Sequence, residues 1–287
     1  MGCLMDNYAF GKVRRFALVL ASVILLSGFQ FLEAALAPDA DLWPRWESHD
    51  PDSTARVDHA DWGHFLKLYV EAGPDGINRI AYARVTEADK QALHDYLARL
   101  RLVVIDDFAR PEQLAYWINL YNALTVRLVL DFLPIKSIRD INISSSIFAG
   151  PWQRKLLEVD DEPLSLNDIE HRILRPIWRD PRIHYAVNCA SIGCPNLQPV
   201  AFTGDTADAL LDKAAHEYIN HRRGARVEDG DLTASKIYLW FADDFGGESG
   251  VIDHLRLYAG PELVRALTGV QSIDDYEYDW GLNGSGS

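Results

Sequence analysis

The chain has 287 residues, and its 28 basic against 42 acidic side chains give a net charge of −14 at pH 7. With 48% hydrophobic and 24% charged residues, the composition is that of a globular protein. It excludes a disordered chain, a collagen-like repeat and a coiled-coil rod. The acidic balance argues against nucleic-acid binding, which needs clustered lysines and arginines. Three cysteines are too few for a scaffold built from disulfides.

The N-terminus has the three parts of a secretory signal. Lys12, Arg14 and Arg15 precede an apolar run over 16–26, and the small-residue sequence Ala35-Leu36-Ala37 follows. A membrane-spanning helix needs about 20 apolar residues, so this run is short for one. We therefore expect a signal peptide over 1–37 and a periplasmic or secreted protein that leaves the membrane after cleavage. The alternative is an uncleaved segment that anchors the chain in the inner membrane.

Beyond the signal, residues 38–60 contain three prolines and two tryptophans, which predict an extended N-terminal arm anchored on the domain by its indoles. The domain itself is expected over 61–283, before a Gly/Ser tail at 284–287. Helical periodicity begins near Asp61, and Thr86 is placed to cap a second helix.

The strongest helix begins after Pro111. Its buried face is predicted to carry Leu114, Trp117, Ile118, Tyr121, Thr125, Leu128 and Phe132, widened by Ala115 and Val126. Asn119 and Asn122 lie at the edge of this face, where a buried amide without a partner would cost about 1–3 kcal/mol. Bonds to neighbouring backbone and a place in a functional site are both open interpretations.

A further helix is capped by the sequence from Ser165 to Asp168. Glu170 lies between Leu166 and Ile173 on the core face of this helix, where a carboxylate needs a partner. His171 points to the flank. Pro176 fits poorly in a helix interior and predicts an end or a kink near Arg175.

After Pro181 the pattern changes to a period of two. Ile183, Tyr185, Val187 and Cys189 alternate with His184 and small residues, which predicts a buried strand over 183–190. The strand would lead into a turn-forming loop over 191–195. On a regular strand His184 would point away from Cys189.

The remaining segments predict a helix over 205–221, a hairpin at 227–232, a short helix around 237–241, and two helices near 249–258 and 261–268. Together these elements predict the α+β class: an α-rich single domain with a small antiparallel or mixed sheet.

Cys189 and Cys194 are the two cysteines of the predicted mature chain, and three uses are open to them. They can form a structural disulfide, since disulfides persist outside the cytoplasm. They can form a redox pair, although the spacing is wider than C-x-x-C. Cys189 can also be a nucleophile presented at the end of a strand, which requires a base and an orienting group.

Metal and cofactor motifs do not occur. The sequence has no H-E-x-x-H or H-x-x-E-H spacing, no phosphate-binding glycine-rich loop and no G-x-S-x-G elbow. We therefore predict neither a metal nor a cofactor.

Six segments, in this order, resemble the DUF547 family, a domain of unknown function found in exported bacterial proteins and in plants. They are WINLYNA at 117–123, DIEH at 168–171, HYAVNCA at 184–190, CP at 194–195, DDFG at 243–246 and YDW at 278–280. The resemblance covers about 110–283. It implies a site formed by Cys189, Glu170 and His171, with an optional disulfide to Cys194. The content of cysteine and histidine is similar to that of papain- or transglutaminase-like enzymes, an analogy only.

Two classes of function follow. The first is a cysteine-dependent hydrolase or acyl transferase acting on a small molecule or a peptide: Cys189 attacks, His171 takes the thiol proton, Glu170 orients it, and Asn119 or Asn122 donates to the oxyanion. The alternative is a non-enzymatic binding module for a small thiol or a partner protein, in which Cys189–Cys194 is a structural or redox disulfide. No pattern indicates the substrate or the oligomeric state.

The signal interpretation predicts that the mature protein begins near Pro38. N-terminal sequencing of the protein from its native host checks this expectation. Recovery of Met1 would contradict it.

Overall fold

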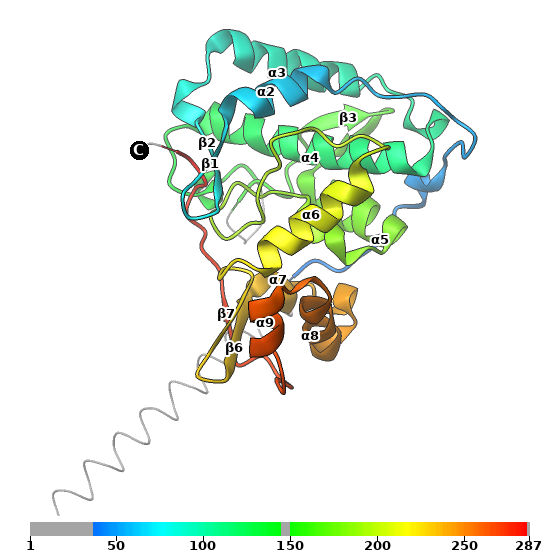
Figure 1. Ribbon diagram of the computed structural model, residues 1–287. Helices are drawn as coiled ribbons and strands as arrows, with labels where there is room; N and C mark the ends of the chain where they lie inside the picture. The colour runs from blue at the N-terminus through cyan, green and yellow to red at the C-terminus, as the bar shows by residue number, and fades with distance from the viewer. Residues whose placement is uncertain (1–36, 145–149, 286–287) are drawn as a thin grey trace, which may run out of the picture.

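The computed structural model describes residues 37–144 and 150–285 (Figure 1). Its α-helices are α2 (Ala60–Tyr69), α3 (Glu87–Leu100), α4 (Arg110–Phe132), α5 (Arg175–Trp178), α6 (Ala207–Ile219), α7 (Lys236–Trp240), α8 (Gly247–Tyr258) and α9 (Pro261–Ala266). Its strands are β1 (Val70–Ala72), β2 (Asn78–Ile80), β3 (Leu157–Val159), β4 (Glu162–Leu164), β5 (Ala225–Glu228), β6 (Asp231–Ser235) and β7 (Asp275–Glu277). Short 3₁₀ helices are η1 (Pro44–Glu47), η2 (Tyr82–Arg84), η3 (Ile105–Asp107), η4 (Ile138–Asp140), η6 (Pro181–Tyr185) and η7 (Ala242–Phe245), and η5 (Asp168–Leu174) is a π-helix.

The buried residues form two apolar cores, one above the other in Figure 1. The larger core lies among α2, α3, α4 and η5, and the smaller one lies among the sheet β5-β6-β7, α7 and α8. Helix α6 belongs to both, since Leu211 packs in the larger core and Tyr218 in the smaller. The chain is therefore one α-rich α+β domain, as the sequence predicts.

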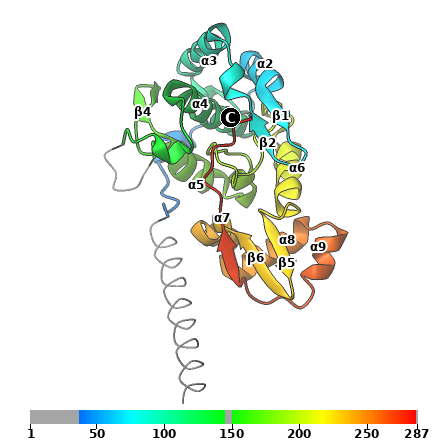
Figure 2. The ribbon, with the colours of Figure 1, turned by 90° about the vertical axis from the view of Figure 1, so that its left-hand side faces the viewer.

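The small core is built on a mixed sheet. β5 and β6 are antiparallel, and β7 pairs with β6 in parallel, with Ala234 opposite Tyr276. The predicted hairpin is confirmed: Asp229 and Gly230 connect β5 to β6 with φ values of 55° and 98°, as a tight hairpin turn requires. After β7 the chain runs up to the larger core, where Gly284 lies beside Ile80 (Figure 2).

Local signals for the helices are largely confirmed. Thr86 caps α3 through a bond from the Asp89 N–H to its hydroxyl (3.1 Å), and α4 begins beside Pro111. The prediction that Phe132 is buried is wrong, because it is the last residue of α4 and is 41% exposed. The helix end reaches the surface there, although the apolar spacing continues.

The strand predicted over 183–190 is wrong. Asp180 accepts a bond from the Arg182 N–H (2.9 Å), Pro181 occupies the first turn, and the chain forms η6 followed by a loop. Every side chain from Ile183 to Asn188 is buried. A short segment that is buried on all sides has no polar face, so periodicity cannot distinguish strand from helix there. The inference that His184 points away from Cys189 loses its basis.

The helix predicted after Ser165 exists but is a π-helix. The Ser165 hydroxyl accepts from the Asp168 N–H (3.1 Å), and the Arg175 N–H bonds to the Glu170 carbonyl five residues back. At Arg175 the chain changes to the α-helix α5, with Pro176 in its first turn, where a missing N–H is tolerated. The kink predicted near Arg175 is this change of helix type.

The N-terminal arm is tied into the large core. Trp46 is buried and packs edge-on against Trp117, with 5.1 Å between ring centroids. The Asp41 N–H donates to the His171 carbonyl (2.9 Å), and the Trp43 N–H to the Arg172 carbonyl (3.0 Å). The arm therefore covers η5.

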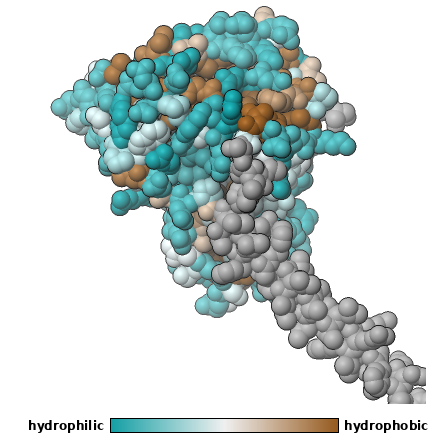
Figure 3. All heavy atoms as spheres, turned by 180° about the vertical axis from the view of Figure 1, so that it is seen from behind, coloured by the Kyte–Doolittle hydropathy of each residue, from teal (hydrophilic) through white to brown (hydrophobic). Residues whose placement is uncertain are grey.

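The outer surface is mainly hydrophilic on the face shown in Figure 3, with scattered apolar side chains. In the described ranges, no helix combines the length and the apolar character needed to span a bilayer.

Replacing Trp117 by Ala should lower the free energy of unfolding by about 3–5 kcal/mol, because it empties a site among Trp46 and Tyr116. Urea denaturation measures the change. The control is Leu257→Ala on α8, where a side chain that is 73% exposed should contribute less than about 0.5 kcal/mol. Equal stability of the two variants would contradict the packing of α4.

Candidate functional site

The loop after η6 carries a disulfide between Cys189 and Cys194, whose Cα atoms are 6.3 Å apart. Cys194 is buried and Cys189 is partly exposed. Between them, Ala190 is fully buried with a φ of 58°, a left-handed conformation that residues other than glycine, asparagine and aspartate rarely adopt. The surrounding contacts hold this loop in a strained conformation, which is common at functional sites.

Both sulfur atoms lie next to hydrogen-bond donors. The Tyr278 hydroxyl donates to Cys194 Sγ (3.1 Å) and lies 3.0 Å from Cys189 Sγ. The Ser191 hydroxyl lies 3.2 Å from Cys189 Sγ and 2.8 Å from the Tyr278 oxygen. The backbone N–H of Cys189 also donates to Cys194 Sγ (3.0 Å). Burial raises the pKa of Tyr278 above its usual value, so the hydroxyl keeps its proton at neutral pH.

The C-terminal segment after β7 brings Tyr278 to this loop. The Gly193 N–H donates to the Asp279 carbonyl (2.8 Å), and the Ile192 N–H donates to the Gly281 carbonyl (2.7 Å). A Cβ atom on Gly193 would lie 2.8 Å from the Asp279 nitrogen, so only glycine permits this approach. The loop and the segment are thus held together by backbone bonds.

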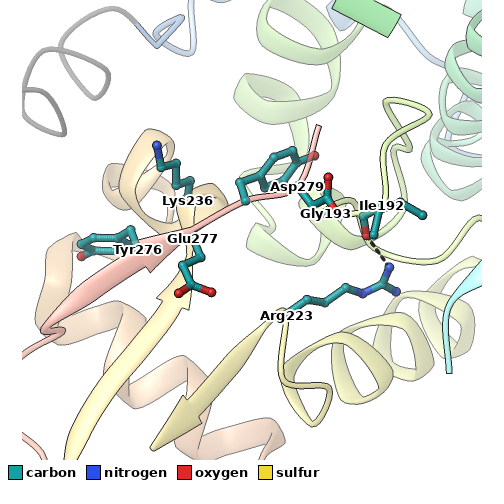
Figure 4. Close-up of a pocket in the computed structure, with 8 residues that line it drawn as sticks. Ile192, Gly193, Arg223, Lys236, Tyr276, Glu277 and Asp279 are labelled. Atoms are coloured by element: carbon teal, nitrogen blue, oxygen red, sulfur yellow. Dashed lines mark hydrogen bonds between the residues drawn. The ribbon is translucent and has the colours of Figure 1, made fainter. Parts of the chain in front are cut away.

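A solvent-open hollow of about 440 Å³ adjoins the loop (Figure 4). Its lining comprises Ile192, Gly193, Arg223, Lys236, Tyr276, Glu277, Tyr278 and Asp279. Arg223 donates to the Ile192 carbonyl (2.8 Å), the dashed line in Figure 4, while Glu277 pairs with Arg226 (2.7 Å). Tyr278 lines the hollow and also contacts both sulfurs, whereas neither cysteine is among the lining residues.

Asn119 and Asn122 bond to backbone. The Asn119 amide donates to the Phe202 carbonyl (2.8 Å) and accepts from the Phe202 N–H (3.0 Å). The Asn122 amide donates to the Ala186 carbonyl (2.8 Å) and accepts from the Asn188 N–H (2.8 Å). Asn122 therefore holds the chain immediately before Cys189.

A buried ionic cluster lies below η5. The Arg175 guanidinium binds Asp244 with two bonds, of 2.6 and 3.1 Å, and also donates to His171 Nδ1 (3.0 Å) and to the Pro38 carbonyl (2.7 Å). His184 Nε2 lies 2.7 Å from Asp244 Oδ2. The cluster thus connects the arm, η5, η6 and η7.

Two pKa shifts follow from this cluster. Burial alone would raise the pKa of Asp244, but the bonds from His184 and Arg175 overcome it and hold that pKa well below its usual range. Burial lowers the pKa of His171 to about 4, so its ring is neutral at pH 7. Because Nδ1 accepts from Arg175, the proton of this neutral ring lies on Nε2. No ring nitrogen of His171 is then free to accept a thiol proton.

Glu170 is buried, being only 7% exposed, and its carboxylate faces His184, with 3.9 Å between Oε1 and Nδ1. Burial and the charge of Glu170 together raise the pKa of Tyr121 well above its usual value. In the described part of the chain, no lysine or arginine forms an ion pair with Glu170, because Arg175 binds Asp244 instead.

The structure thus separates the predicted residues into two groups. Cys189 and Cys194 are bonded together, whereas Glu170 and His171 belong to the ionic cluster, and no hydrogen bond joins either histidine to Cys189 within the described ranges. The residues that sequence reasoning missed are Tyr278, Ser191, Arg175, Asp244 and His184 in its cluster role. Tyr278 and Asp244 lie in motifs quoted for the family resemblance, which was the available signal for them.

Fold and site define an α-rich α+β domain with a disulfide loop closed by its own C-terminal segment. Residues 105–219 match the model of a family described as "Protein of unknown function, DUF547", and this region of the chain belongs to that family. The match includes Glu170, His171 and both cysteines but ends before β5, so Tyr278 and Asp244 lie outside it. No curated protein and no solved structure matches the chain.

Replacing Asp244 by Asn should lower the free energy of unfolding at pH 7 by about 3 kcal/mol, because Arg175 stays buried without its partner. The folded pKa of Asp244 is depressed, so the stability it contributes is present above the unfolded value of about 4 and is lost as the pH falls. The difference between wild type and variant should therefore shrink toward about pH 3. Urea denaturation across this pH range checks it, with the exposed neighbour Asp243→Asn as control. A difference that is independent of pH would contradict the assignment.

Proposed function

We propose that this chain is an exported protein that exchanges its Cys189–Cys194 disulfide with external thiols. The observation that carries the proposal is the asymmetry of the sulfur pair. Cys189 is partly exposed, whereas Cys194 is buried and accepts bonds from the Cys189 N–H and the Tyr278 hydroxyl. Disulfide exchange needs one accessible sulfur and one good leaving group, and donors that stabilise a thiolate make a better leaving group.

The exchange begins when an external thiolate attacks Cys189 Sγ. The bond between the two cysteine sulfurs breaks, and its electron pair leaves on Cys194 Sγ, which later takes a proton from solvent. A second external thiolate then attacks the external sulfur of the mixed disulfide and releases Cys189 as a thiolate. In total, two thiols are oxidised to a disulfide and the protein disulfide is reduced by two electrons.

The incoming thiol belongs to a small molecule or a peptide. The hollow lined by Gly193 and Tyr278 adjoins the loop that carries the disulfide, and its volume of about 440 Å³ is in the range of small-molecule sites. Export supports the same chemistry, because a disulfide persists outside the cytoplasm. The proposed signal at 1–37 lies almost wholly outside the described residues.

A cysteine-dependent hydrolase or acyl transferase is the second candidate, with reduced Cys189 as its nucleophile. It is favoured by ring contacts that connect the disulfide loop with the acid–base residue His184. Trp240 packs on Tyr278 (4.9 Å between centroids), and the next residue, Phe241, stacks on His184 (4.4 Å). In this candidate Glu170 and His184 would supply proton transfer after movement toward Cys189.

Two serine variants test the exchange. Incubated with oxidised glutathione, Cys194→Ser should form a stable mixed disulfide at Cys189, because the resolving cysteine is absent. In Cys189→Ser, labelling at Cys194 should be at least about tenfold slower, since the Cys194 sulfur is buried. Intact-protein mass spectrometry measures both.

Equal labelling of both variants, or none for either, would refute the exchange. Redox-independent hydrolysis of ester or amide substrates that Cys189→Ser abolishes would instead establish the second candidate.

A further inference from the structure

We propose that the buried carboxylate of Glu170 opposes thiolate formation at Cys189 and so lowers the reactivity of its reduced thiol at neutral pH. The inference rests on the proposed exchange and names the residue that tunes it. Glu170 touches neither sulfur; it is a positioning residue that acts through the groups between them.

Two chains of contacts bring Glu170 to the disulfide. In the first, His184 faces Glu170 and stacks on Phe241, whose neighbour Trp240 packs on Tyr278, the residue in contact with both sulfurs. In the second, Tyr121 of α4 adjoins Glu170, and the next residue, Asn122, holds the Asn188 N–H beside Cys189.

The charge of Glu170 also reaches the sulfur contact directly. Burial is the largest cause that raises the pKa of Tyr278, and the charge of Glu170 raises it by a smaller amount, while the Ser191 hydroxyl and the charge of Arg223 lower it. A negative charge that disfavours a phenolate at Tyr278 also disfavours a thiolate at Cys189, which lies 3.0 Å from the same hydroxyl.

The charges around Glu170 do not cancel its own. The titratable groups that face it or lie in its cluster are His171, Arg175, His184, Asp244, Tyr121 and Tyr278. Arg175 is the one permanent cation among them, and it binds Asp244 with both prongs. Among the residues that the structure describes, no permanent cation therefore forms an ion pair with Glu170.

Glu170 then works against Tyr278 and Ser191. Their hydroxyls stabilise a thiolate through hydrogen bonds, whereas the carboxylate destabilises it through charge. The carboxylate therefore lowers the thiolate fraction of reduced Cys189 at neutral pH, and the reactivity of the thiol depends on that fraction. As the pH falls and the thiols become protonated, the penalty from Glu170 disappears.

The test uses the full chain in a Cys3→Ser and Cys194→Ser background, where Cys189 is the one remaining cysteine. The ultraviolet absorbance of the thiolate is followed against pH, and the iodoacetamide labelling rate is measured in parallel. Glu170→Gln, which keeps the shape and removes the charge, should lower the pH midpoint by about one unit and raise the labelling rate at neutral pH several-fold.

The matched control is Glu112→Gln. Glu112 is also a buried carboxylate, but it accepts from the Val57 and Gly204 N–H groups (2.8 and 2.9 Å) and has no contact with the loop in the described ranges. Its removal should leave the midpoint unchanged. A structural role of Glu170 would lower stability without moving the thiol titration.

An unchanged or higher midpoint in folded Glu170→Gln would overturn the inference. Should that variant not fold, Glu170→Asp retracts the charge by one methylene and should lower the midpoint by a smaller amount, and no shift there would be equally decisive against it. The thiol titration does not require exchange to occur. A shift of the midpoint without mixed-disulfide formation would support the role of Glu170 and refute the proposed function. Mixed-disulfide formation without a shift would support the proposed function and refute the role of Glu170.

Discussion

The site depends on the backbone pairing between the disulfide loop and the C-terminal segment. Two hydrogen bonds, from Ile192 and Gly193 to the segment after β7, hold Tyr278 against sulfurs that precede it by 89 and 84 residues. Without this pairing the loop would lose the hydroxyl donor of Tyr278, and the hollow would lose Tyr278 and Asp279 from its lining. The absence of a side chain at Gly193 makes the close approach possible.

The buried ionic cluster has a different role in the same architecture. Burying the Arg175–Asp244 pair carries a desolvation cost that its attraction repays only through good geometry. Three partners of Arg175, namely Asp244, His171 and the Pro38 carbonyl, meet that condition. Together with the contact of His184 with Asp244, they fix the arm, η5, η6 and η7 relative to one another. Adjacent residues Trp240 and Phe241 then join this cluster to Tyr278 through ring contacts.

Local sequence patterns predicted the elements whose signals are local. The cap at Thr86, the Asp229-Gly230 turn and the amphipathic face of α4 depend on residues within a few positions of one another. The same reasoning failed over 183–190, because burial on every side removes the polar alternation that separates helix from strand. It also expected a partner for the buried carboxylate of Glu170, but the buried arginine of this region, Arg175, makes its two-pronged bond with Asp244.

The sequence by itself determined the α+β class with a small sheet and the burial of Glu170. It left open whether that sheet is antiparallel or mixed and whether the two cysteines five residues apart are bonded. Only the tertiary structure decided what surrounds them. Periodicity and capping report on neighbours along the chain, whereas the contacts of Tyr278 with Cys189 and of His184 with Asp244 join residues 89 and 60 positions apart. Such contacts follow from how the two cores pack, and no local pattern encodes that packing.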